Sequence, residues 1–366
     1  MNTSVELTPY LERLDSLIDP DHVKHTSDLH ENAFAYRPVD HIPTNIIYPV
    51  SNDEWPSFTY QEIFDDPAKM LLSELASAYA GARIKDDRLY GIRANYGTGI
   101  LSSLFGCETR TFDDTLPIGL RLSADKLEKV LDAGIPDVHS GLCGRALETV
   151  AYFREVLKPY PKLSKYIGSQ MLDIQGPFDN ATIIWGSDLY LAVLDEPEKV
   201  DRILGMVTQT IKALVIEHRR IDGMSLYEHD GDWNWLGGLC IRNDSSINLS
   251  GTQYRDLVKK YDASLINWVG GWIHFCGKAH QWWEDLLDID GLKGVNPYQG
   301  EFYDLPDMYD KCRQAGVAIV QWTIPLDRRS GELVRTGFSH SVFARDYDDA
   351  VRMRDEIHKC NYPISK

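Results

Sequence analysis

The stretch from Gly270 to Lys278 carries two side chains that could bind a metal ion together. Its apolar residues favour β structure and glycines bound it, which predicts a short buried strand that ends in a polar loop. His274 and Cys276 are two residues apart, so on a strand they point to the same face. An imidazole and a thiol that converge at a strand end can form half of a zinc site. The simpler alternative is a hydrogen-bonded histidine beside a buried apolar cysteine.

Composition limits the classes of function. A chain of 366 residues can form one large α/β barrel or two ordinary domains. The formal net charge of -17 argues against nucleic acid or an anionic membrane as a general partner. We see no secretory signal and no apolar run of the roughly 20 residues that a membrane helix needs. The six cysteines are sparse and irregularly spaced, which favours a reducing cytoplasm over a disulfide framework.

Strand-like segments alternate with helices, most regularly in the second half of the chain. The expected strands are Thr44–Val50, Leu89–Gly97, Gln170–Pro177, Leu236–Ile241, the Gly270 stretch, Leu292–Asn296, Val317–Ile324 and Leu333–Phe338. Helices are expected at Pro9–Ile18, Ala68–Ala80, Leu147–Leu157, after Glu196, after Ser250, at Met308–Ala315 and at Asp346–His358. This alternation predicts βαβ units, and about eight strands favour a TIM (β/α)8 barrel over an open sheet. We expect one domain, with residues 1–36 as a helical N-terminal extension and residues 37–366 as the barrel.

Such a barrel would gather polar residues at the carboxyl ends of its strands, where the active sites of this fold lie. The candidates for contact with a substrate are Asn95, Tyr96, Gln175, Gln321 and Trp322. The candidates for catalysis are Asp173, Asn243 and Asp244, which would orient ligands or form a second shell around a metal. Each of them could instead be a loop cap or a turn residue.

Five segments of the chain resemble the uroporphyrinogen decarboxylase superfamily, and they follow one another in the expected order. They are Arg37–Pro43, Asp173–Phe178, Asp195–Val200, Asn248–Ser250 and His274–Gly277. The resemblance implies a TIM barrel. Its haem-pathway branch grips porphyrinogen carboxylates through an early Arg-Gln-Ala-Gly-Arg-Tyr motif, whereas the corresponding loop here, Tyr48–Trp55, has no arginine.

The other branch of the superfamily consists of zinc methyltransferases that act with methylated corrinoids, and His274-x-Cys276 is similar to the first part of its signature. The second part is a cysteine at the last strand, which Thr336–His340 lacks. Zinc also accepts imidazole nitrogen and carboxylate oxygen. We therefore expect His340 and Glu301 to complete a zinc site with His274 and Cys276.

The resemblance therefore implies a methyltransferase that moves a methyl group between a corrinoid and a zinc-activated thiol or similar acceptor. The corrinoid would be a cofactor or would be carried by a partner protein, and the resemblance also allows a homodimer. A first alternative is a metal-free decarboxylase, with Asp86, Asp87 or Asp173 as the catalytic carboxylate and Arg93 as a carboxylate clamp. A second alternative is a non-catalytic barrel that binds a corrinoid or another ligand.

Overall fold

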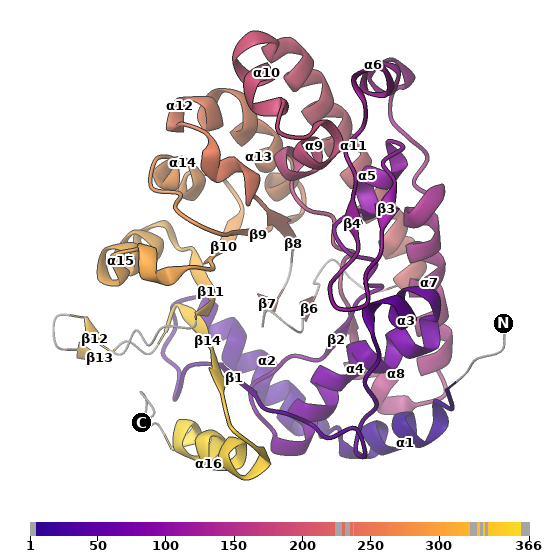
Figure 1. Ribbon diagram of the computed structural model, residues 1–366. Helices are drawn as coiled ribbons and strands as arrows, with labels where there is room; N and C mark the ends of the chain where they lie inside the picture. Colours follow the sequence, from indigo (N-terminus) through magenta and orange to yellow (C-terminus); the bar gives the residue numbers. More distant parts are fainter. Residues whose placement is uncertain are drawn as a thin grey trace.

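Six parallel strands form one continuous sheet in the computed structural model of the chain (Figure 1). The structure describes residues 5–223, 229–230, 235–236, 238–322, 328–329, 332–333 and 336–359. The sheet runs in the order β1, β14, β11, β10, β9, β8. These strands are β1 Thr44–Ile47, β14 Phe338–Phe343, β11 Ala318–Trp322, β10 Leu292–Pro297, β9 Gly271–Phe275 and β8 Leu239–Arg242. A separate parallel pair joins β2 Gly91–Ile92 to β5 Gly168–Ser169.

Helices surround these strands and bury one large apolar core (Figure 1). They are α1 Thr8–Leu17, α2 Pro20–Phe34, α3 Tyr60–Asp65, α4 Pro67–Ile84, α5 Ile100–Leu104, α6 Ala124–Ala133, α7 Gly141–Leu157, α8 Pro161–Tyr166, α9 Pro177–Trp185, α10 Leu189–Asp195, α11 Pro197–Asp222, α12 Gly251–Gln253, α13 Lys259–Val269, α14 Trp283–Leu287, α15 Leu305–Ala315 and α16 Tyr347–His358. Leu11 and Leu14 of α1 lie in the same core as the strands, so this N-terminal helix packs against the rest of the fold. None of the helices in the described part of the chain combines the length and apolar character that a bilayer crossing requires.

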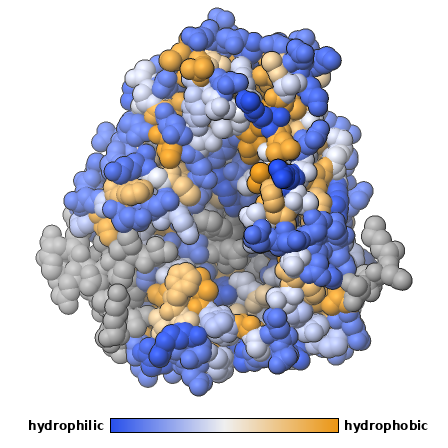
Figure 2. Space-filling model, in the orientation of Figure 1, coloured by the Kyte–Doolittle hydropathy of each residue, from blue (hydrophilic) through white to orange (hydrophobic). Residues whose placement is uncertain are grey.

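Three short antiparallel strand pairs add to this framework in the described residues. β3 Thr109–Arg110 pairs with β4 Ile118–Gly119, β6 His229–Asp230 with β7 Trp235–Leu236, and β12 Arg328–Arg329 with β13 Glu332–Leu333. The face shown in Figure 2 is mostly hydrophilic, with apolar side chains in scattered groups. That distribution agrees with the acidic composition of the chain.

The strand ladder does not close into a ring among the described residues, because β1 and β8 are the edges of the six-stranded sheet. Side chains join β1 to the segment before β2. The backbone N–H of Ile46 donates to Asp86 at 2.9 Å, and the N–H of Thr44 donates to Asp87 at 3.0 Å. We call this contact the β1–β2 seam.

A second seam joins the segment after β5 to β8. Asp173 pairs with Arg242 of β8 at 3.2 Å. A Cβ atom on Gly176 would lie only 2.4 Å from the carbonyl oxygen of Arg242, so the two segments touch at a position that only glycine fits. We call this contact the β5–β8 seam. The expected closed ladder of eight strands is therefore replaced, in the described residues, by six paired strands, one separate pair and two seams made by side chains.

Two of the expected strands are much shorter than their sequence pattern indicates. The segment Leu89–Gly97 contains only the two residues of β2, and β5 ends before Gln170. In the segment after β5, two backbone carbonyl groups accept hydrogen bonds from a side chain and not from a neighbouring strand. The amide of Asn180 donates to the carbonyl oxygens of Ile174 and Gly176, at 2.6 and 3.0 Å. Pro177, the last residue of the expected strand, is instead the first residue of α9.

The last strand is displaced toward the C-terminus from the expected Leu333–Phe338. Gly337 has a φ of +86° and its N–H donates to Ala33, so the chain turns there before β14 begins. Ser339, His340 and Ser341 are all buried, and this polar run hides the strand from a pattern based on hydrophobicity. Residues 334–335 lie outside the described part of the chain.

Candidate functional site

Asp244, His274 and Cys276 present one oxygen, one nitrogen and one sulfur to a common point at the carboxyl edge of the sheet. Their ligand-type atoms all lie within 4.8 Å of one another. His274 Nε2 is 3.6 Å from the sulfur of Cys276 and 3.5 Å from Asp244 Oδ1. The backbone N–H of Cys276 donates to the same oxygen of Asp244 at 2.6 Å. We call these three residues the Asp-His-Cys cluster.

A hydrogen-bond relay fixes the proton of His274 on the nitrogen that faces away from the cluster. Asn296 donates its amide N–H to the carbonyl of Val320 at 2.5 Å, so its oxygen is left to accept from His274 Nδ1 at 2.6 Å. Nδ1 therefore carries the proton and Nε2 offers a lone pair to the cluster. Histidines that bind metals are held in this way by a partner behind the ring.

Burial and the local negative charge keep the sulfur of Cys276 protonated in the metal-free chain. Burial, together with the nearby Asp244 carboxylate, raises the pKa of Cys276 to about 12. Burial also lowers the pKa of His274, so its ring is neutral at pH 7. A divalent cation would reverse the situation of the sulfur, because a coordinating thiol loses its proton. The donor set and the neutral imidazole fit a zinc ion.

Asp179 holds the loop that carries Asp244, although it was not among the expected site residues. Its carboxylate accepts the N–H groups of Asp244 and Ser245 at 3.0 and 2.7 Å, which fixes the loop after β8. Burial and the charge of Asp244 raise the pKa of Asp179 to about 7. An acidic residue in the first turn of a helix that starts with proline was the only signal for it in the sequence.

A buried ion-pair group lies beside the cluster on the β5–β8 seam. Asp173 pairs with Arg242 at 3.2 Å and with Arg93 at 3.9 Å, and Gln175 donates to it at 2.5 Å. Burial opposes ionisation of Asp173, but the two guanidinium groups outweigh it and lower the pKa of the carboxyl. Arg93 was expected at the site only in the decarboxylase alternative, and Arg242 was not among the expected site residues.

Gln175 and Gln321, two of the expected substrate contacts, have backbones in the left-handed region. Their φ angles are +54° and +48°. For residues other than glycine this conformation costs on the order of 1 kcal/mol and concentrates at binding and catalytic sites. The N–H of Gln321 donates to Ser339 at 2.8 Å, which helps to hold the turn.

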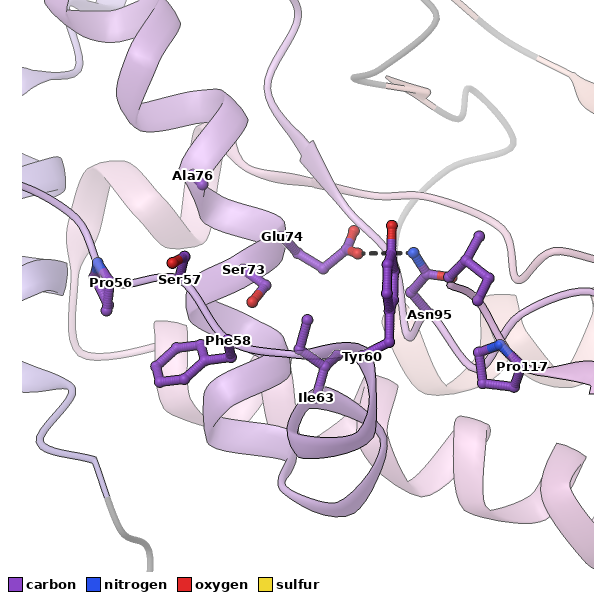
Figure 3. A pocket seen from close by; sticks show the side chains of 11 residues that line it. Pro56, Ser57, Phe58, Tyr60, Ile63, Ser73, Glu74, Ala76, Asn95 and Pro117 are labelled. Carbon is purple, nitrogen blue, oxygen red and sulfur yellow. Dashed lines mark hydrogen bonds between the residues drawn. The ribbon is translucent and has the colours of Figure 1, made fainter. Parts of the chain in front are cut away.

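The other expected site residues lie in different surroundings. Asn243 donates to the buried Asp262 at 2.6 Å, so its amide contacts α13 and not the cluster. Tyr96 is fully buried and its hydroxyl bonds Thr149. Asn95 lies on the wall of an open pocket of about 370 Å³, where it donates to Glu74 at 3.2 Å (Figure 3). Trp322 is buried at the end of β11.

The two expected additional zinc ligands do not belong to the Asp-His-Cys cluster. Glu301 is exposed in the turn after β10. His340 is buried within β14, and its Nδ1 atom bonds the carbonyl of Trp322. Asp244, expected in a supporting position, is the third ligand-type side chain instead. Cys312 is buried in α15, and Cys360 lies outside the described residues.

Comparison with known proteins gives a match at the level of structure. No family model matches the chain, and no curated protein matches it. Among solved structures, a methyltransferase from Methanosarcina mazei is similar, with a TM-score of 0.62 and 14% sequence identity. The similarity covers 90% of this chain and 97% of that one. The chain therefore shares the α/β fold of this methyltransferase over nearly its whole length.

Proposed function

We propose that the protein is a zinc-dependent methyltransferase with a uroporphyrinogen decarboxylase-like TIM barrel. In this proposal residues 37–366 form the barrel, and it moves a methyl group between a corrinoid and a thiol acceptor. The observation that carries the proposal is the convergence of Asp244, His274 and Cys276 at the carboxyl edge of the parallel sheet. The fold shared with a methyltransferase supports it.

The proposed zinc ion would be held by the three side chains of the Asp-His-Cys cluster. When bound, it would supply the positive charge that keeps an acceptor thiol deprotonated near neutral pH. Asn296 holds His274 in the binding tautomer, and Asp244 accepts the N–H of Cys276, so the chain fixes two ligands before any ion binds. The side chain of Asp244 is 42% exposed, which leaves this side of the cluster open to a substrate.

The expected reaction forms a carbon–sulfur bond and breaks the cobalt–carbon bond of a methylated corrinoid. The thiol proton leaves to solvent and the cobalt keeps the bonding electron pair. The residues of the chain would position the two reactants, which is the main contribution to a transfer of this kind. Our candidates for contacts with the acceptor are Arg242 at the end of β8, Gln321 near the end of β11 and Gln175 in the segment after β5. A partner protein that carries the corrinoid, and a homodimer, remain compatible with this proposal.

The first test compares untagged wild-type protein with Cys276→Ser. We expect Cys276→Ser to contain about one zinc per chain less than the wild type and to lose methyl transfer from methylcobalamin to small thiols. Elemental analysis measures the metal, and the corrinoid absorbance measures the transfer. Cys240→Ser is the matched control, because Cys240 is also a half-buried cysteine of this sheet, in β8. Equal metal and equal transfer in Cys276→Ser and wild type would contradict the proposal.

The buried pair of arginines on Asp173 favours a second candidate, a metal-free decarboxylase. Arg93 and Arg242 could grip a substrate carboxylate, with Asp173 between them. The other two carboxylates of this alternative, Asp86 and Asp87, instead accept backbone N–H groups of β1. Turnover of a porphyrinogen by Cys276→Ser, together with no zinc in either protein, would favour this candidate.

A further inference from the structure

A second group of ligand-type side chains lies at the opposite end of the strands, near their amino ends. His41 precedes β1, Asp87 precedes β2, and His358 is the last residue of α16. The ligand atoms of these three residues all lie within 4.8 Å of one another. In a parallel sheet the segments before the strands lie at the edge away from the Asp-His-Cys cluster, so this group is separate from it. We call it the His-Asp-His cluster.

We propose that His41, Asp87 and His358 bind a divalent transition-metal ion such as zinc. Each imidazole presents its Nε2 atom to a different oxygen of the same carboxylate, at 3.0 Å for His41 and 3.2 Å for His358. The two rings lie side by side, with centroids 4.6 Å apart. Two imidazole nitrogens and one carboxylate oxygen are a ligand set that zinc accepts, with a fourth position for water.

An ion can replace the two hydrogen bonds without changing the charge of the rings. When Nε2 binds a metal, the single proton of the neutral ring moves from Nε2 to Nδ1, so the imidazole stays neutral. The single carboxylate then faces one divalent ion in place of two N–H donors. The two rings and the carboxylate need little movement to bind an ion, because their ligand atoms already converge within 4.8 Å of one another.

Further contacts hold the carboxylate of Asp87 in position. The N–H of Thr44 donates to its Oδ2 atom at 3.0 Å, and His30 bonds the backbone carbonyl of Asp87 at 2.7 Å. Partners of this kind orient metal ligands in known sites. Asp87 and His41 are almost fully buried, whereas the side chain of His358 is 30% exposed, so an ion would enter past the end of α16.

A metal here would tie three distant parts of the chain together. It would fix the last helix, α16, to the segments that lead into β1 and β2. Because the folded chain assembles the ligands and the unfolded chain does not, binding would stabilise the fold. This role is independent of the proposed methyl transfer.

The test measures metal in four untagged proteins: wild type, Cys276→Ser, His358→Ala and His25→Ala. We expect His358→Ala to contain about one metal ion per chain less than the wild type, and Cys276→Ser to keep the ion at the His-Asp-His cluster. His25 is an exposed histidine of α2, so His25→Ala should match the wild type. Loss of metal in Cys276→Ser but not in His358→Ala would overturn this inference and leave the proposed function standing.

Cobalt(II) gives a second readout that does not depend on the metal present after purification. Added to metal-free Cys276→Ser, Co²⁺ should produce visible absorption without a sulfur-to-metal band and should raise the unfolding temperature. The double variant with His358→Ala should show neither effect. No cobalt binding by correctly folded Cys276→Ser would overturn the inference, and His41 and His358 would then be hydrogen-bonding partners of Asp87 only.

Discussion

Buried histidines make the stability of this protein depend on pH. His218 lies in α11 and is fully buried, and its Nε2 atom has no hydrogen-bond partner among the described residues. Burial, with a smaller effect of Arg219, lowers the pKa of His218 to about 4. In the unfolded chain the pKa of histidine is close to 6.5.

The sign of the effect follows from which state binds the proton. Between about pH 4 and 6.5 the unfolded chain protonates His218 and the folded chain does not, so stability falls as the pH falls through this range. For a pKa of about 4, the loss from this residue between pH 7 and pH 5 is about 2 kcal/mol. Urea unfolding at both pH values should show a smaller pH effect in His218→Gln than in wild type. An unchanged pH effect would show that His218 is accessible to protons in the folded state.

At the same scale, the sequence could indicate the chemistry of single residues but not which of them meet. The spacing of His274 and Cys276 was enough to predict that they share a face. Asp244 and Asp179 join them because the fold brings distant positions together. Asp179, for example, accepts the N–H of Asp244, which is 65 residues away in the sequence. A single sequence does not show which residues are in contact, so it cannot distinguish these two carboxylates from the other acidic residues of the chain.

At the scale of elements, the segment after β5 depends on a close approach to β8. Gly176→Ala would place a methyl group 2.4 Å from the carbonyl of Arg242, which forces the two segments apart. We expect a loss of stability of about 1 to 3 kcal/mol, typical of overpacking. Denaturant unfolding measures it.

Gly205→Ala is the matched control for this substitution. Gly205 lies inside α11, and the nearest atom to its added Cβ is 3.8 Å away, on Tyr261. Alanine is the better helix former, so this variant should gain about 0.5 to 1 kcal/mol. A loss in Gly205→Ala equal to that in Gly176→Ala would contradict the explanation based on close approach.

Elements with regular apolar spacing were predicted well. The helix expected after Glu196 is α11, and Val200, Ile203 and Leu204 belong to its buried apolar stripe. β9 and β10 also lie where the sequence indicates. The displaced elements are those whose buried faces are polar, such as β14, or whose backbone is bonded by side chains, such as Gln170–Gly176. Periodicity reports apolar burial and carries no information on either case.

At the scale of the whole molecule, the β1–β2 seam depends on a buried ion pair. Asp86 is fully buried, accepts the N–H of Ile46 and pairs with Arg88 at 3.0 Å. Asp86→Ala would leave the Arg88 charge and a backbone donor unpaired inside the protein. The expected cost is about 3 to 5 kcal/mol, as for other broken buried pairs.

Urea unfolding of Asp86→Ala and Asp28→Ala separates this effect from a general loss of acidic charge. Asp28 pairs with Lys24 on the surface, where both side chains are more than half exposed. Surface pairs contribute little, so Asp28→Ala should unfold close to the wild type. If the two variants unfolded alike, the β1–β2 seam would not depend on Asp86.

The two seams also bear on how this architecture can change during evolution. In a fully laddered barrel, backbone hydrogen bonds between neighbouring strands fix the spacing of all strands. Here the spacing at the β5–β8 seam is set by Asp173, Arg242 and a glycine. Replacing one of these residues would change the distance between the two segments beside the Asp-His-Cys cluster, while the six-stranded sheet stays intact. The surroundings of the cluster can therefore diverge through substitutions at one seam, without rebuilding the scaffold.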